Sequence, residues 1–222
     1  MDPLDNPVWA ALTGPQERFG RRHGRAARFD PEVSPFAALD DPGDAAAWDD
    51  LRKLVEPGER VIVAAPGLKV PDGWEGDELP GFQLVGPDCR GAPAPGSVEL
   101  GAADVPEMLD LRERTRPGPL LARTVELGGY RGFRRDGVLA AMAGRRMHVP
   151  GWVEISAVCT DPAFRGEGLA TRLIAAVTDG IRADGERPFL HVAGDNTAAI
   201  RLYERLGFAV RTPVNFSGVT PR

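Results

Sequence analysis

The stretch Arg165-Gly166-Glu167-Gly168-Leu169-Ala170 decides how the second half of this 222-residue chain folds. Before it, residues 152–160 (WVEISAVCT) show the alternating pattern of side chains typical of a strand and are rich in β-forming residues. A strand is therefore predicted there. After it, apolar residues recur at helical spacing and predict a long amphipathic helix, whose buried face holds Ala170, Leu173, Ile174, Val177 and Ile181. The two glycines therefore stand at a strand-to-helix junction.

Gly166 and Gly168 allow the backbone at this junction to turn its N–H groups outward. The first helical turn adds unpaired N–H donors and the positive end of the helix dipole, so the junction predicts an anion site with Arg165 at its rim. A tight turn without a ligand explains the same glycines, and both interpretations stay open at this point. A dinucleotide site is disfavoured, because Thr171 stands where its third glycine belongs.

The rest of the second half alternates strands with helices. A helix is predicted over residues 105–114, and another is capped by Asp195 or Asn196 and stops at Gly207. Strands are predicted over residues 97–100, 130–135, 138–143, 189–193, 208–211 and 214–217. This order indicates an α/β (α+β) fold, in which helices cover the faces of a mixed sheet.

The segment 86–96 (GPDCRGAPAPG) is rich in glycine and proline and is interpreted as a linker. It divides the chain into a first region, residues 1–96, and a second, residues 97–222. In the first region we predict helices over residues 7–18 and 45–55 and strands over 60–65 and 81–85. The first region shows no catalytic constellation.

Two motifs in the second region are similar to those of the GNAT N-acetyltransferase superfamily. Arg-x-x-Gly-x-Ala at residues 165–170 is followed by Asn196-x-x-Ala199-x-x-x-Tyr203-x-x-x-Gly207-Phe208. The close match covers residues 150–211. The resemblance implies a mixed, mostly antiparallel sheet flanked by helices over residues 97–222. On element order, residues 1–96 are interpreted as a degenerate copy of the same fold.

The resemblance also implies a cosubstrate, acetyl-CoA, and a place for it. The pantetheine arm is expected along residues 156–160, bonded to the backbone of Val158 and Thr160 as another strand would be. A backbone N–H, that of Val158, is expected to stabilise the oxyanion. The remaining cofactor-binding residues of the prediction are Arg165, Gly166, Glu167, Gly168, Leu169, Ala170, Thr171, Asn196, Ala199 and Tyr203.

Two residues are predicted to move protons. Tyr203 is the expected general acid for the departing thiolate, and a tyrosine that is merely packed is the alternative. Glu154 is the expected base, because alternation places it on one side with Ser156, Val158 and Thr160 and half-burial raises the pKa of a carboxylate. The alternatives for Glu154 are attraction of a cationic substrate or pairing with an arginine. His191 is interpreted as a core histidine.

The charge, apolar content and cysteines of the chain limit the classes of partner that it can have. Residues 1–96 carry 10 basic and 17 acidic side chains and residues 97–222 carry 17 and 15, so the half with the anion site is the less acidic one. The net charge of −5 argues against nucleic acid, and no apolar run is long enough for a membrane. Cys89 and Cys159 form no metal spacing, so no metal is predicted, and with no export signal the chain is expected in the cytoplasm.

The sequence therefore predicts an N-acetyltransferase that transfers an acetyl group from acetyl-CoA to a primary amine by direct attack in a ternary complex. The expected partners are a small-molecule or peptide amine and a second copy of the chain in a homodimer. Two alternatives stay open: a non-catalytic module that binds or senses acyl-CoA, and an enzyme that transfers another acyl group.

Overall fold

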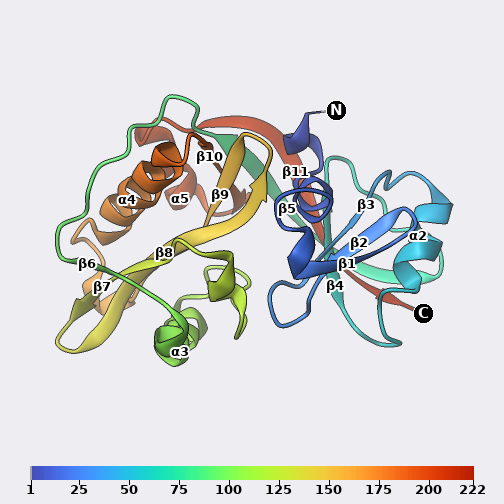
Figure 1. The fold of residues 1–222 in the computed structure, drawn as a ribbon, viewed down its shortest axis with the longest axis horizontal. Helices are drawn as coiled ribbons and strands as arrows, with labels where there is room; N and C mark the ends of the chain where they lie inside the picture. Colours follow the sequence, from blue (N-terminus) through green and yellow to red (C-terminus); the bar gives the residue numbers. More distant parts are fainter. Residues whose placement is uncertain (1) are drawn as a thin grey trace.

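The computed structural model describes residues 2–222, in which 11 strands form one continuous sheet (Figure 1). From edge to edge the order is β1-β2-β3-β4-β11-β5-β10-β9-β8-β7-β6. The strands are β1 (Gly20–His23), β2 (Ala26–Phe29), β3 (Phe36–Leu39), β4 (Val61–Ala65), β5 (Trp74–Val85), β6 (Ser97–Glu99), β7 (Arg131–Arg135), β8 (Val138–Val149), β9 (Trp152–Thr160), β10 (Arg187–Ala193) and β11 (Ala209–Pro221).

Five α-helices accompany the sheet within residues 2–222. They are α1 (Pro7–Leu12), α2 (Ala45–Arg52), α3 (Val105–Thr115), α4 (Leu169–Ala183) and α5 (Thr197–Arg205). Short 3-10 helices are η1 (Pro3–Asp5), η2 (Glu17–Phe19), η3 (Ala102–Asp104), η4 (Thr124–Leu127) and η5 (Pro162–Phe164). None of the helices in this described part is long and apolar enough to cross a membrane.

The two halves of the chain repeat one topology. In each half, three antiparallel strands lead through a helix to a parallel neighbour: β1-β2-β3, α2 and β4 in the first, and β7-β8-β9, α4 and β10 in the second. β3–β4 and β9–β10 are the parallel pairs among residues 2–222, and the other pairs are antiparallel. The interpretation of residues 1–96 as a degenerate copy of the second half stays a prediction.

The last strand of each half is exchanged between the halves. β5, from the first half, pairs with β10 of the second, and β11, from the second half, pairs with β4 of the first. β5 and β11 also pair with each other over their length, from Ala209↔Val85 to Pro221↔Trp74, and they form the long curved bridge in Figure 1. The division of the chain into two folding units at residue 96 stays a prediction.

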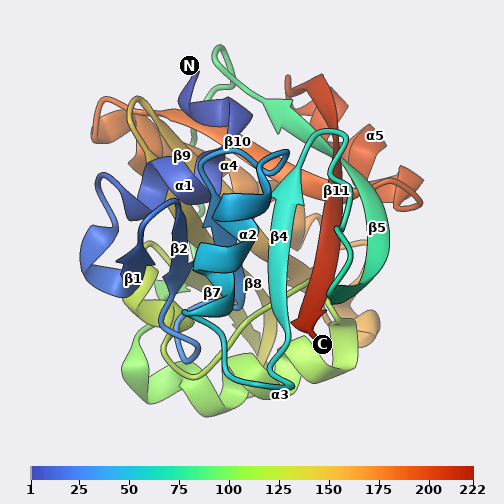
Figure 2. The same cartoon turned by 90° about the vertical axis from the view of Figure 1, so that its right-hand side faces the viewer.

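Helices cover both faces of the sheet. α4 and α5 pack on one face of the second half through Leu173, Ile174, Val177 and Tyr203. α3 packs on the opposite face through Met108 and Leu111. In the first half α2 lies over the sheet, as Figure 2 shows. It packs there through Trp48 and Leu51.

A fourth apolar core joins the two halves. Val8 on α1, Phe29 and Phe36 from the first half pack against Met147 and Phe189 from the second. Polar contacts reinforce this junction: the Gln16 side chain donates to the carbonyl of Arg146 (2.8 Å), and the Thr124 hydroxyl donates to that of Val33 (2.7 Å). The concave face of the sheet therefore holds residues of both halves close together.

The predicted fold class, a mixed and mostly antiparallel sheet flanked by helices, is confirmed. Several bounds differ. The helix predicted over residues 7–18 ends at Leu12, because Gly14-Pro15 cannot continue it. Residues 208–211 and 214–217 belong to one strand, β11, with an irregularity between Val210 and Thr212. The short strands β1, β2 and β3 had no recognised signal in the sequence.

Candidate active site

The parallel strands β9 and β10 separate part of the way along their length. Their pairing runs from Arg187↔Trp152 to Leu190↔Ile155 and stops there, while residues 156–160 continue to pair with β8. A cavity of about 300 Å³ opens at this divergence, and Val158, Asn196, Ala199 and Tyr203 are among the residues that line it. The structure thus brings four of the predicted site residues into one space.

A β-bulge at Ala157 changes which side chains share a face of β9. Ala157 has a positive φ of 53°, and the register with β8 shifts between Gly144↔Ser156 and Met142↔Cys159. Val158 consequently packs with Ile155 in the core under α4, while Cys159 packs under α3. The prediction that Glu154 shares a side with Val158 and Thr160 is therefore wrong, because the extra residue in the bulge reverses the alternation.

The glycine turn has the conformation that an anion site needs. Gly166 and Gly168 have φ values of 90° and 70°, and a Cβ at either would meet open space. Within residues 2–222, the backbone N–H groups of residues 166–171 have no hydrogen-bond acceptor, and Gly168, as N-cap of α4, offers no side chain to them. Arg165 is exposed, while the Glu167 carboxylate is paired with Arg135 (3.2 Å). Six consecutive N–H donors are thus without an acceptor in the described part of the chain.

Asn196 and Tyr203 begin and end one face of α5. The Asn196 side chain accepts from the N–H of Ala199 (3.1 Å), so the capping role considered from the sequence is confirmed. Tyr203 is 7% exposed, and its hydroxyl has no hydrogen-bond partner in residues 2–222. Burial raises the pKa of Tyr203 to about 12, so its hydroxyl keeps the proton throughout the neutral range.

Glu154 differs from the half-buried base that the sequence suggested. It is fully buried, and Arg146 donates to both of its oxygens, from Nε (2.8 Å) and Nη2 (2.5 Å). Burial by itself would raise the pKa of Glu154, but the charge and hydrogen bonds of Arg146 and the hydrogen bond from His191 outweigh it and lower the pKa to about 2. The expected raised pKa is wrong, and the alternative of pairing with an arginine is the one observed.

Glu154 belongs to a row of polar side chains that crosses five neighbouring strands. His191 Nδ1 donates to Glu154 Oε1 (2.7 Å), so His191 Nε2 accepts from the Gln83 amide (3.2 Å). Arg211 donates to the Gln83 carbonyl oxygen (3.1 Å). The row of Arg211, Gln83, His191, Glu154 and Arg146 therefore lies on β11, β5, β10, β9 and β8, in their order in the sheet.

Sequence reasoning missed Arg146 and Gln83. Arg146 lies on the strand β8, which was expected to end near residue 143 but continues to Val149. A charged residue inside a buried strand indicates that it has a buried partner. This signal can be recognised only when the bounds of the strand are known. Gln83 was placed correctly on a strand, but nothing local indicates that this strand lies beside β10.

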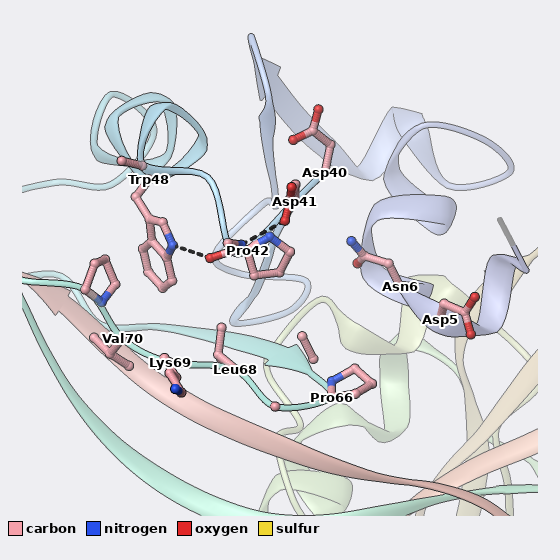
Figure 3. A pocket seen from close by; sticks show the side chains of 15 residues that line it. Asp5, Asn6, Asp40, Asp41, Pro42, Trp48, Pro66, Leu68, Lys69 and Val70 are labelled. Carbon is pink, nitrogen blue, oxygen red and sulfur yellow. Dashed lines mark hydrogen bonds between the residues drawn. The ribbon is translucent and has the colours of Figure 1, made fainter.

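The first half holds a second cavity at the place equivalent to the β9–β10 divergence. It measures about 800 Å³ and is lined by residues that follow β3 and β4, among them Asp40, Asp41 and Leu68, with Trp48 from α2 (Figure 3). The turn before α2 is acidic, and the Asp44 side chain already caps the helix through the N–H of Ala46 (2.9 Å). A turn of that charge is unfavourable for a pyrophosphate, unlike the turn at residues 165–168.

Metal chemistry has no ready place in the described residues. No group of three His, Cys, Asp or Glu side chains within residues 2–222 is arranged to hold an ion. Cys89 and Cys159 are buried free thiols, and burial raises the pKa of each to about 11, so neither has the ionised character of a nucleophile.

Comparisons with known proteins agree with this geometry. The FR47-like protein family matches residues 130–216. A solved structure from Novosphingobium aromaticivorans DSM 12444, described as an acetyltransferase from the GNAT family, is 40% identical and superposes with a TM-score of 0.92 over 100% of both chains. A GCN5-related N-acetyltransferase from Kribbella flavida has the same fold, with a TM-score of 0.65 and 21% identity over 95% of this chain and 93% of that one.

Curated relatives point the same way. The Mycothiol acetyltransferase of Gordonia bronchialis is 31% identical over 228 residues, which cover 89% of this chain and 68% of the relative. An uncharacterized protein of Mycobacterium leprae is also 31% identical, over 83% of this chain and 55% of its own length. The chain thus spans between about half and two thirds of these two relatives. It belongs to the GNAT family of acetyltransferases, and its divergent β9–β10 pair is the candidate active site of that class.

Proposed function

We propose that this protein transfers the acetyl group of acetyl-CoA to the primary amine of a small molecule, by direct attack while both are bound. One observation carries the proposal. The unpaired part of β9 and the protonated hydroxyl of Tyr203 share one cavity, and β9 leads through η5 to a turn with six free N–H donors. Each of these features matches one part of a thioester cosubstrate.

The residues present fit acetyl-CoA. Backbone groups of Val158 and Thr160 are available to pair with the pantetheine amides, because β10 no longer occupies that edge of β9. The N–H groups of residues 166–171 would hold the pyrophosphate with help from the positive end of α4, and Arg165 would add a charged donor. Asn196 and Ala199 would border the arm from α5.

Two groups of the chain would then act on the reacting atoms. The backbone N–H of Val158, displaced by the bulge at Ala157, would donate to the carbonyl oxygen as negative charge develops there. Tyr203, held in its protonated form, would donate its proton to the departing sulfur. Bound acetyl-CoA supplies the activated acyl group, so no covalent bond to the protein is required.

Deprotonation of the amine is assigned differently from the sequence-based expectation. A carboxylate with a pKa near 2 that is bonded to Arg146 and His191 is a weak base, so Glu154 acts through the residues that it orients. No carboxylate side chain is among the residues that line the cavity in the described part of the chain. We expect the amine to react in its neutral form after losing a proton to solvent in the cavity.

The acceptor is proposed to be a small molecule. The cavity has a volume of only about 300 Å³, and the relatives named Mycothiol acetyltransferase act, by that name, in the chemistry of a small thiol compound. A homodimer and a cytoplasmic location stay predictions from the sequence.

The test is a turnover assay with the whole chain. Purified protein is incubated with acetyl-CoA and a panel of amines while free thiol is followed, and CoA affinity is measured by calorimetry. Thiol release that depends on an amine, with formation of the N-acetyl product, supports the proposal. Tight CoA binding without turnover across the panel would instead identify a non-catalytic acyl-CoA-binding module.

A further inference from the structure

Arg146 keeps part of its hydrogen-bonding capacity unused. Its Nε and Nη2 atoms bond Glu154, but Nη1 has no hydrogen-bond partner within residues 2–222. The side chain is 9% exposed, so this buried cation is nearly but not fully enclosed. A buried guanidinium normally has its donors satisfied, and an unused edge that still reaches a cavity indicates a place for a ligand acceptor atom.

The guanidinium of Arg146 lies beside the active-site cavity. The guanidinium of Arg146 lies over the ring of Phe36, 4.8 Å from its centroid, and both residues line the same cavity as Tyr203 and Val158. Glu154 holds the guanidinium, and His191 is bonded to Glu154 in turn. Arg146 is thus fixed in one orientation by its partners, with Nη1 as the remaining donor.

The wall beside Arg146 comes from the strands that join the halves and from the first half. Phe36, Ile62, Leu79 and Phe216 line the cavity there. Phe36 and Phe216 contact each other edge to face with their centroids 6.4 Å apart, and they form an apolar surface. Residues 1–96 carry a net negative charge as a whole, but none of their acidic side chains in the described part of the chain lines the cavity. The part of the first half that faces the cavity is therefore apolar.

The charges of the cavity favour one sign of ligand. Arg116 is a second lining cation, exposed at the end of α3 and without an ion pair among the described residues. His191 also lines the cavity, and its ring is engaged by Glu154 and Gln83. Glu154 compensates the charge of Arg146, so Arg116 supplies the net positive charge of the cavity, whose walls hold no aspartate or glutamate among the described residues. This charge favours an anionic ligand over a polycation.

We propose that the acceptor is a primary amine that also carries a carboxylate and an apolar side group, with the carboxylate bound by Arg146 Nη1. Arg116 attracts the same carboxylate from the rim, and the apolar group contacts Phe36 and Phe216. Glu154 and His191 are positioning residues that hold the guanidinium in place. This inference rests on the proposed acetyl transfer and adds the class of substrate to it.

The experiment compares amines that differ only in the carboxylate. The probes are L-phenylalanine and L-leucine, the carboxamide of each, and spermidine, with kcat/KM measured by thiol release. A carboxamide lowers the pKa of its amine relative to the free amino acid and leaves more of it neutral, so amine reactivity favours the carboxamide. We expect the carboxylates to be preferred by about 10- to 100-fold, the range of a hydrogen bond to a charged group.

Variants test whether Arg146 is the cause. Arg146→Gln alone leaves Glu154 buried without its partner and endangers folding. The double variant Arg146→Gln/Glu154→Gln replaces the ion pair with two neutral amides that can still bond each other. It should retain a cooperative thermal transition and bring the ratio of carboxylate to carboxamide kcat/KM close to one. Arg116→Ala should lower the same ratio partially, whereas Arg112→Ala, on α3 but outside the cavity, should not change it.

Failure of this inference is distinguishable from failure of the proposed function. If amines are acetylated but carboxamides or spermidine equal the carboxylates, the substrate class is wrong and acetyl transfer stands. A preference that survives intact in the folded double variant would overturn the role of Arg146. Absence of CoA binding and of thiol release with every amine would overturn the proposed function, and this inference with it.

Discussion

Gln83 on β5 and His191 on β10 face each other directly across the sheet, and their Nε2 atoms lie 3.2 Å apart. Gln83 belongs to the first half of the chain and His191 to the second. The Gln83 amide also donates to the carbonyl of Leu4 (2.9 Å), and this second bond fixes the Gln83 side chain beside His191. The polar row behind the active site is therefore completed by a strand from the other half.

Because of this exchange, residues 97–222 should not fold alone. Without residues 1–96, β10 loses its antiparallel partner β5, and β11 loses both β4 and β5. The unpaired edges should drive aggregation or pairing between copies. Size-exclusion chromatography and circular dichroism of the fragment, against the whole chain, measure this. A monomeric fragment with a cooperative unfolding transition would mean that the second region is an independent unit.

Tyr203→Phe should lower kcat by about 10²- to 10⁴-fold, the usual contribution of a positioned acid, with little change in CoA affinity. The substitution removes only a hydroxyl that has no partner in the described residues, so stability should change little. Stopped-flow or steady-state thiol release gives kcat, and calorimetry gives the dissociation constant of CoA. Tyr130→Phe is the matched control, since Tyr130 is the other tyrosine of the chain and is buried outside this cavity. Equal losses in the two variants would remove Tyr203 from the mechanism.

Gly168→Asp should weaken CoA binding by at least about tenfold while the fold persists. A Cβ at this position meets open space, but the new carboxylate would lie at the N-terminus of α4, compete for its free N–H groups and repel the pyrophosphate. Gly168→Asn controls for the positive φ of 70°, which Asn and Asp both tolerate. Calorimetry with CoA should separate the two variants, and identical affinities would argue that the turn does not hold the cosubstrate.

Glu154 should make stability depend on pH in the acid range. Its pKa is lowered from an ordinary 4.5 to about 2, so its contribution is present above about pH 4.5 and is lost as pH falls toward 2. Glu154→Gln should lower the unfolding free energy by about 3–5 kcal/mol at neutral pH, because Arg146 is left uncompensated. Denaturant titrations should show the difference from the native chain narrowing below about pH 4.5.

The control for that titration is Glu59→Gln. Glu59 also pairs with a buried arginine, Arg28, but is itself 26% exposed, so water already screens the pair. Arg28 also keeps its bonds to the carbonyls of Phe29 and Leu54 when Glu59 is replaced, so the loss should be smaller. A difference between Glu154→Gln and the native chain that stays constant from pH 7 to pH 3 would contradict the lowered pKa.

Local patterns were sufficient for much of the second half. The glycines of residues 165–170, the apolar spacing of α4 and the cap at Asn196 each act within a few residues, so they can be recognised along the chain. The same is true of the hairpin turn at Asp136-Gly137, which joins β7 and β8. These features determined the fold class and the candidate cosubstrate site.

Other features depend on contacts between distant segments. The sequence alone determined the order of a strand, a glycine turn and a helix with Asn196 and Tyr203, and the predicted anion site at the turn rests on that order. Only the tertiary structure decided the state of Glu154, because its pKa depends on Arg146 and His191 from neighbouring strands. The bulge at Ala157 and the insertion of β5 beside β10 are equally non-local. Pairing between strands is set by the whole sheet, and no spacing within one segment encodes which strand becomes its neighbour.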